Sequence, residues 1–573
     1  MKKKIIFLII PLALSFISCG APPIKADLIV YGDNIYTSNA NNEFVEAFAV
    51  KDGKFIAVGN KEDIDKFKGN DTVIYDEKFV MPGGIESHGH WILEEAFKLG
   101  FYISPYKTDH SNKNFDDILN DISEYSRNHP ELDRIYGYGF DVSENGLPDL
   151  KKFDEVFPNI AVFISECSLH GAYVNSKCFE LAGVLDEDKD GIVIDRIDGK
   201  VMGFARDEAC SYIIRKVFDN LFTTEQLETA VTNATHNLNK NGYVVHYDTW
   251  SNFDGSDNMY KAIHNLDTSG NLNFLFSSAY CIESFEKDKI DSMINKTLTL
   301  KNTYTSAHYK PSMLKLFADG IVETGTGFII DSYNTGPDDH GTQIWDNATM
   351  TSIVNKANKV GIPVHIHTMG DAACKEAVDA FVDSYNNNGY IRNSIGHVAL
   401  IRPEEISRIS QYNFALSSGA NWASQISNDD ITMSRPFINE STLRSLYPFK
   451  EYIDAGVKAA LHTDNPCSPG ILDIFGYIQV MLNGWDHSKD MSAKMFPRRN
   501  SGFVSIKDAI NMFTINGAWM NNLENERGSI EVGKYADFIF GSADPFATNI
   551  DDVWQVKVTK TFFEGNEVYK KPN

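Results

Sequence analysis

The sequence predicts an α/β fold: a (β/α)8 TIM-like barrel with a small β-sandwich domain formed from both chain ends. Two observations predict this class. Short apolar runs alternate with longer helical patterns through the middle of the chain, which is typical of βα units around a parallel sheet. Strand-like runs also stand near both termini. A chain of 573 residues with 43% hydrophobic residues is long enough to bury a barrel core and a second, smaller core.

The first residues predict an export signal. Three lysines at 2–4 precede an apolar segment at 5–18, which is too short to span a bilayer and suits a signal peptide over residues 1–18. The signal ends in Phe16-Ile17-Ser18-Cys19-Gly20, which resembles the lipobox of bacterial lipoprotein signals, where the cysteine becomes the lipidated first residue. We therefore expect an exported protein, anchored by a lipid on Cys19 to the periplasmic or cell-surface side of a bacterial membrane. The alternative is a conventionally secreted protein with an incidental cysteine.

The strongly negative net charge of the chain argues against nucleic acid and anionic lipid as binding partners. The formal net charge is -25 at pH 7, and removing residues 1–18 takes away three lysines, which leaves -28 (-25 minus 3). So acidic a protein is a poor match for nucleic acid or anionic lipid, so membrane contact would come from the lipid anchor alone. The six remaining cysteines are widely spaced without a Cys-x-x-Cys pair, which excludes a zinc ribbon. We expect a small-molecule substrate as the partner.

The two ends of the chain, residues 26–78 and 528–570, predict the small β-sandwich domain. A strand-like run at 27–37 is followed by two more, at 47–50 and 55–59, which flank the hairpin signal Asp52-Gly53. A matching set of runs lies between 528 and 570. Strands at both ends with a long middle between them indicate that the ends pair into one domain.

Residues 79–527 predict the barrel. The eight candidate strands are 79–85, 242–247, 273–279, 313–318, 362–367, 394–398, 414–417 and 457–462. Eight βα units favour a closed barrel over an open sheet, and a barrel places its active site where the strands end. Residues from about 100 to 240 do not fit the alternation, so we expect a long insertion there.

Histidines at strand ends indicate a metal site. His88 and His90 have only a glycine between them, so they face the same way and can reach one ion. Taken alone, two surface histidines in a loop are the commoner explanation of such a pair. His365 and His367 likewise share one strand face. Later strand ends add His397, His462 and Asp464. Since buried ionisable groups are costly unless they are paired or bind metal, their convergence on one barrel mouth predicts a functional site.

Eight segments in the same order resemble the amidohydrolase superfamily of metal-dependent hydrolases, and more closely its branch of N-substituted formamide deformylase-like proteins. Met81-Pro82-Gly83-Gly84-Ile85-Glu86-Ser87-His88-Gly89-His90 matches the branch's Pro-Gly-x-Ile-Asp-x-His-x-His segment. The other matching segments are 138–141, 168–176, 314–320, 367–371, His397, 463–466 and 528–537. The resemblance covers nearly the whole exported chain, and agreement of all eight in order makes chance improbable.

The resemblance implies a divalent metal, most simply zinc, present as one ion or two. The residues that match the family's metal ligands are His88, His90, Lys315, His367, His397 and Asp464. Lys315 matches the lysine that is carboxylated and bridges two metals in binuclear members; alternatively, it pairs inside the barrel with Asp319 or Glu323. Asp464 matches the ligand that also acts as general base, taking a proton from metal-activated water and passing one to the leaving nitrogen.

Four further polar residues could have either a functional or a purely structural role. The family pattern implies substrate contact for His170 and Asp319, whereas a structural histidine and a turn carboxylate are the plain alternatives. We interpret His365 as an inward filler or a donor to a ligand rather than a ligand itself. Asp371 opens a helical stretch and is expected to be its N-cap.

Two residues depart from the family pattern. Glu86 stands where the branch has Asp, so it is expected to alter the support of His88, and His462 stands where the branch has a small residue, so it either crowds the pocket or adds a ligand. The resemblance implies a hydrolase of a carbon-nitrogen bond that is not a peptide bond, as in an N-substituted amide, a formamide or a cyclic amide. Two alternatives stay open: a deaminase or other-bond hydrolase on the same site, or an inactive lipid-anchored binding protein.

Overall fold

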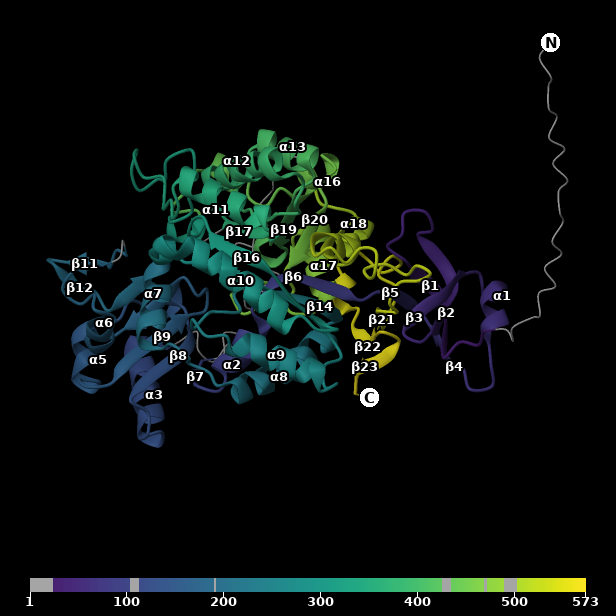
Figure 1. Ribbon diagram of the computed structural model, residues 1–573, viewed down its shortest axis with the longest axis horizontal. Coiled ribbons are helices and arrows are strands. Elements are labelled where there is room, and N and C mark those ends of the chain that lie inside the picture. Colours follow the sequence, from purple (N-terminus) through teal and green to yellow (C-terminus); the bar gives the residue numbers. More distant parts are fainter. Residues whose placement is uncertain are drawn as a thin grey trace, which may run out of the picture.

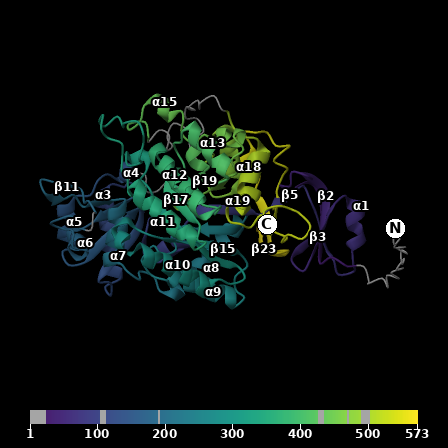
Figure 2. The same cartoon turned by 45° about the horizontal axis from the view of Figure 1, so that its top comes forward.

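The computed structural model describes residues 24–103, 113–189, 192–424, 434–467, 471–488 and 502–572. The predicted signal peptide and Cys19 lie outside these ranges, so export and lipidation stay predictions. Within the described ranges, no helix combines the length and the apolar character needed to cross a bilayer. A central barrel lies between two smaller parts, a sheet built from both chain ends and a blue insertion on the opposite side (Figure 1, Figure 2).

Eight parallel strands form the barrel, and each predicted strand overlaps one of them. In chain order they are β6 (Gly84–Gly89), β14 (Tyr243–Asp248), β15 (Leu275–Cys281), β16 (Tyr309–Phe317), β17 (Val364–Thr368), β18 (Ser394–His397), β19 (Ala415–Gly419) and β20 (Ala459–His462). Each strand pairs in parallel with the next. β20 returns beside β6, where the Ser87 hydroxyl donates to the Leu461 carbonyl at 2.7 Å. The predicted TIM-like barrel is confirmed.

Helices surround the barrel, and side-chain caps begin several of them. They are α2 (Trp91–Phe97), α8 (Thr224–Lys240), α9 (Asn258–Thr268), α10 (Ile290–Tyr304), α11 (Asn347–Lys359), α12 (Asp371–Asn388), α13 (Pro403–Tyr412), α15 (Glu440–Leu443), α16 (Phe449–Asp454), α17 (Ile474–Asn483), α18 (Ile506–Phe513) and α19 (Ile515–Met520). Thr223 and Gln226 form a capping box at α8, which satisfies backbone N–H groups that a helix start otherwise leaves unpaired. Leu, Val and Ala of α8 face the barrel, whereas its polar face meets solvent.

The first predicted barrel strand, 79–85, is two strands in the structure. β5 (Phe79–Pro82) pairs with β21 (Phe538–Gly541) in the terminal sheet, and β6 enters the barrel. Gly83 stands at the change of partner, where a Cβ would lie only 2.7 Å from Cγ2 of Val244. No side chain fits at this point, so glycine is required where the chain passes from one sheet to the other.

Both chain ends build one sheet, as their pattern predicts. Its strands are β1 (Leu28–Tyr36), β2 (Phe44–Lys51), β3 (Lys54–Gly59), β4 (Val73–Glu77), β5, β21, β22 (Val558–Phe563) and β23 (Asn566–Lys570), with the short helix α1 (Lys61–Ile64) beside them. The two halves of the expected sandwich are hydrogen-bonded into one continuous sheet that curls around its own core. The rings of Phe48 in β2 and Phe538 in β21 lie 5.0 Å apart, although β5 and β1 separate these strands in the sheet.

The expected insertion carries its own sheet and core beside the barrel mouth. The sheet runs β13 (Phe204–Arg206), β10 (Gly171–Val174), β9 (Ala161–Glu166), β8 (Arg134–Phe140) and β7 (Phe101–Tyr102), and a separate hairpin joins β11 (Arg196–Ile197) to β12 (Lys200–Val201). Its helices are α3 (Phe115–Asn128), α4 (Val142–Asn145), α5 (Leu150–Val156), α6 (Ser176–Ala182) and α7 (Glu208–Val217). The loop between β9 and β10 turns toward the barrel and carries His170.

His308 joins the barrel to the terminal sheet, and its charge makes this junction sensitive to pH. Its Nδ1 lies 2.9 Å from Asp267 Oδ1 and its Nε2 lies 3.4 Å from Glu564 Oε1. The hydrogen bond to Glu564 raises the pKa of His308, against the effect of burial, and Asp267 raises it further. Since the folded pKa is raised, the stabilisation is full below the ordinary value of about 6.5 and is lost as pH rises through the folded pKa.

We therefore expect His308→Gln to lower the free energy of unfolding by about 1 kcal/mol at pH 6 and by less at pH 9. Urea unfolding of both proteins at the two pH values measures the difference. An equal loss at both values would show that the imidazolium does not stabilise this junction.

Candidate metal centre

Three predicted ligands meet where the barrel closes. His88 is on β6, His90 follows that strand, and Asp464 follows β20. Nε2 of His88 lies 3.4 Å and Nε2 of His90 lies 3.5 Å from Oδ1 of Asp464. One ligand atom from each residue lies within 4.8 Å of the other two, and all three side chains are buried. The cluster places two imidazoles and a carboxylate around one point, which is a donor set for a borderline divalent metal such as zinc.

A second cluster shares His88. Ligand atoms of His88, His397 and His462 lie within 4.8 Å of one another, and the ring centroids of His88 and His397 are 4.4 Å apart. His462 is the residue that departs from the family pattern. The structure places its ring 4.9 Å from that of His88, as a potential added ligand.

Several buried polar atoms of these clusters have no hydrogen-bond partner among the described residues. They are Nδ1 of His90, Nδ1 of His397, both ring nitrogens of His462, Oδ1 of Asp464 and Nζ of Lys315. An unpaired buried polar group costs about 1–3 kcal/mol, so native proteins seldom leave several together. A bound cation would satisfy one nitrogen of each imidazole that binds it and Oδ1 of Asp464, so the residues of the two triads fit a divalent metal.

Burial keeps the histidines in the form that binds metal. It lowers the pKa of His88 well below its usual range, with the charge of Lys315 acting in the same direction. It lowers the pKa of His397 likewise, and that of His462 to about 3. Burial also lowers the pKa of Lys315 to about 8. Neutral imidazoles can donate a lone pair without first losing a proton.

The other two predicted ligands lie beside the clusters and outside both triads. Nζ of Lys315, on β16, lies 4.6 Å from the ring centroid of Phe317 on the inner face of the barrel. The ring of His367 lies 4.4 Å from that of His397, but its Nε2 lies 3.0 Å from the Gly320 carbonyl oxygen, to which it donates. Their roles as ligands stay predictions.

His365 orients a ligand. Its Nε2 shares a hydrogen bond of 2.8 Å with Nδ1 of His88, and its Nδ1 lies 2.7 Å from the Ser394 hydroxyl. The hydrogen bond to His365 occupies Nδ1 of His88 and leaves its Nε2 to face the clusters. The arrangement agrees with the interpretation of His365 as a donor to a ligand, and such partners fix the ring orientation of metal-binding histidines.

Glu86 connects the two strands that close the barrel. Its carboxylate accepts the backbone N–H of Thr463 at 3.0 Å and that of His88 at 3.2 Å. Burial raises the pKa of Glu86 to about 7, although these hydrogen bonds act to lower it. The carboxylate thereby connects the backbone at His88 to the residue that precedes Asp464.

Two further residues singled out in the sequence, Asp319 and Asp371, form contacts between the loops around the barrel mouth. Asp319 accepts the backbone N–H groups of Phe328 at 2.9 Å and Gly370 at 2.7 Å, so it ties two loops together. Burial raises its pKa to about 8. The expectation that Asp371 caps α12 is wrong, because Gly370 is the N-cap and the Asp371 carboxylate pairs with Arg402 instead.

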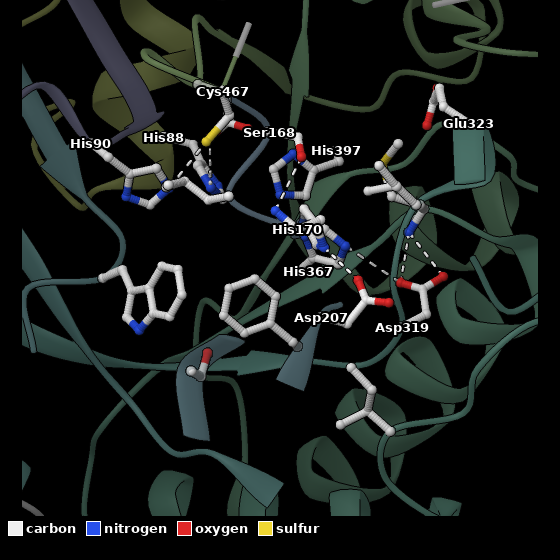
Figure 3. A pocket seen from close by; sticks show the side chains of 18 of the residues that line it. His88, His90, Ser168, His170, Asp207, Asp319, Glu323, His367, His397 and Cys467 are labelled. Atoms are coloured by element: carbon white, nitrogen blue, oxygen red, sulfur yellow. Dashed lines mark hydrogen bonds and ion pairs between the residues drawn. The ribbon is translucent and has the colours of Figure 1, made fainter. Parts of the chain in front are cut away.

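His170 reaches the mouth from the insertion. Its Nδ1 lies 2.8 Å from Oδ1 of Asp207, and its ring lies 5.5 Å from that of His367 (Figure 3). Burial acts to lower the pKa of His170, but the hydrogen bond and charge of Asp207 raise it overall. Asp207 was missed in the sequence because it lies 37 residues from its partner in no recognised motif.

The backbone is strained at two of the site residues. His397 has φ of +71° and Asp464 has φ of +53°, in the left-handed region that residues other than glycine rarely adopt. Such conformations persist where the surroundings impose them, and they concentrate at functional sites. Both residues stand at the end of a barrel strand, where the chain turns and carries the side chain toward the mouth.

A cavity of about 340 Å³ opens above the clusters. Barrel residues line its floor, including His88, His90, His397 and Asp464, and His170 with Asp207 lines the insertion side. Trp250, Phe317 and Trp422 contribute apolar wall. This volume suits a small organic molecule, because binding pockets are about 300–1,000 Å³ and mostly apolar with a few fixed polar groups.

The structure defines a (β/α)8 barrel protein with a potential divalent-metal site at the barrel mouth. The fold matches the solved structure of an uncharacterized metal-dependent hydrolase from Pyrococcus horikoshii OT3 with a TM-score of 0.70 and 22% identity, over 91% of this chain and 99% of that chain. The profile of the amidohydrolase family matches residues 76–569. The chain belongs to the amidohydrolase family, and this family implies a divalent metal.

Two relatives match along almost their whole length. N-substituted formamide deformylase of Arthrobacter pascens is 23% identical over 566 residues, which are 95% of this chain and 98% of that protein. The protein LONG AFTER FAR-RED 3 of Arabidopsis thaliana is 24% identical over 571 residues, which are 96% of this chain and 93% of that protein.

Proposed function

We propose that this hydrolase cleaves a carbon-nitrogen bond other than a peptide bond, in an N-substituted amide, a formamide or a cyclic amide. The observation that carries the proposal is the cluster of His88, His90 and Asp464 at the floor of a cavity whose volume suits a small molecule. The similarity to an N-substituted formamide deformylase supports this choice of bond.

A divalent ion, most simply zinc, would be held by His88, His90 and Asp464, with His397 beside them. When bound, it would polarise the substrate carbonyl and acidify water. Asp464 is the general base of the proposal: it takes a proton from the attacking water as the oxygen bonds to the carbonyl carbon. It then delivers a proton to the nitrogen as the carbon-nitrogen bond breaks. A carboxylate has two oxygens, so one can bind the ion while the other takes the proton.

Lys315 is proposed as a carboxylated bridge to a second ion. Its Nζ is buried without a hydrogen-bond partner among the described residues. Burial lowers the pKa of its amine to about 8, which makes the neutral form that reacts with carbon dioxide accessible near neutral pH. His170, held by Asp207 at the cavity wall, is proposed to contact the substrate, and Asp319 is proposed to support the loops that do so.

Metal content and turnover together test the proposal. We expect one or two zinc or similar ions per chain in the wild type and none retained in His88→Ala/His90→Ala, measured by elemental analysis. A panel of N-substituted formamides, amides and hydantoins should be hydrolysed by the wild type alone. His236→Ala, which removes a surface imidazole from α8, is the control and should retain both metal and turnover.

Three outcomes would change the conclusion. A wild type that stays metal-free after incubation with zinc, manganese and iron would remove the proposed mechanism and favour a binding protein. Metal without turnover of any amide, but with release of ammonia from aminated heterocycles, would favour a deaminase. A double variant that keeps its metal would place the ion elsewhere.

A further inference from the structure

We propose that His462 is a metal ligand and gives the ion a second position, held by three histidines. This inference rests on the proposed function only in requiring that the site bind a divalent ion. The two positions would be the triad of His88, His90 and Asp464, and a three-histidine triad of His88, His397 and His462.

The position of His462 in its strand points it into the barrel. β20 alternates so that Leu461 joins the core outside the barrel, while Ala460 and His462 face inward. His462 is fully buried, and neither ring nitrogen has a hydrogen-bond partner among the described residues. An apolar side chain would fill this space without the cost of two unpaired nitrogens, so packing does not explain an imidazole here.

The surroundings of His462 supply the remaining donors. Its ring centroid lies 4.9 Å from that of His88 and 5.1 Å from that of His397. Three nitrogens bound to one tetrahedral zinc at about 2.0–2.1 Å would stand about 3.3 Å apart. The ligand atoms of the three histidines lie within 4.8 Å of one another, so they need only a small approach. Three protein ligands with a fourth position open is the arrangement of catalytic zinc sites.

The shared histidine makes the two positions mutually exclusive. Nδ1 of His88 is held by His365 at 2.8 Å, which leaves only Nε2 as a ligand atom, and one nitrogen binds one ion. An ion in the three-histidine position would leave both oxygens of Asp464 free for proton transfer. An ion in the other position would be coordinated by Asp464. By holding the ion without Asp464, His462 would separate the carboxylate's role as metal ligand from its role as general base.

Zinc affinity in a cycle of variants tests this arrangement. Asp464→Asn is expected to lose less than about 10-fold in zinc affinity, because the three-histidine position remains, and the same change in a His462→Ala background should lose about 100-fold or more. Competition with a chromophoric chelator measures the constants. His264→Ala, which removes an imidazole of α9 that hydrogen-bonds to the Tyr304 carbonyl outside the barrel, is the control and should leave the affinity unchanged.

X-ray absorption of the zinc-loaded proteins provides a second readout that does not depend on activity. We expect the zinc of the Asp464→Asn protein to have three imidazole ligands. Adding His462→Ala should remove one of them. If His462→Ala changes neither the affinity nor the ligand count in either background, His462 is not a ligand, whereas the proposed hydrolase stands. A wild type that binds no zinc would overturn both.

Discussion

Asp464→Asn is expected to reduce turnover by about 10²–10⁴-fold, the range by which general acid–base groups contribute. The amide has nearly the shape of the carboxylate, but it cannot take a proton from water. In the folded protein Oδ1 of Asp464 lies 3.4 Å from Nε2 of His88 and 3.5 Å from Nε2 of His90, so this carboxylate is the one beside both histidines of the first triad. The loss should persist at saturating zinc, because proton transfer rather than metal binding is removed.

Steady-state kinetics on the best substrate of the panel, with zinc content measured on the same samples, checks this result. Asp473→Asn is the matched control, because Asp473 caps α17 outside the cavity and Asn caps a helix equally well. Its turnover should equal that of the wild type. Turnover of Asp464→Asn within about 10-fold of the wild type would assign the base to another residue.

Arg527→Met is expected to lower the free energy of unfolding by about 3–5 kcal/mol, which is the cost of breaking a buried ion pair from one side. Arg527 is 2% exposed and pairs with Asp537, itself 3% exposed, and with Glu564. Its guanidinium also lies 4.2 Å from the ring centroid of Tyr535. Methionine retains much of the volume but leaves the Asp537 carboxylate buried without its cation.

Chemical unfolding followed by circular dichroism measures the change. Lys560→Met is the control in the same sheet, because it removes a more exposed pair with Glu567 and should cost less than about 1 kcal/mol. Similar losses in the two variants would show that Arg527 contributes no more than a surface charge. The expected difference would show that this buried cation stabilises the C-terminal part of the terminal sheet.

Much of the site could be predicted because a strand repeats every two residues. His365 and His367 share one face of β17, and the apolar Val364 and Ile366, which alternate with them, join the core outside the barrel. The same local rule points His462 of β20 into the barrel. These features depend only on neighbours in the chain, so a single sequence contains them.

Contacts between distant segments could not be predicted in this way. The apolar run at 79–85 gives no sign that the backbone changes sheets at Gly83. The side chain that leaves no room for a Cβ there is Val244 of β14, which is distant in the sequence. The link from His170 to Asp207 crosses the insertion, and Glu86 meets Thr463 only because the last barrel strand returns beside the first.

The sequence by itself therefore determined the barrel, the pairing of the chain ends and which side chains point inward, because periodicity and motif are local. Only the tertiary structure decided which of those side chains meet. Closure of the barrel brings Asp464 to His88, turns His367 toward the Gly320 carbonyl and leaves His462 among the other histidines. Distances across a closed sheet depend on every strand between, and no local pattern records them.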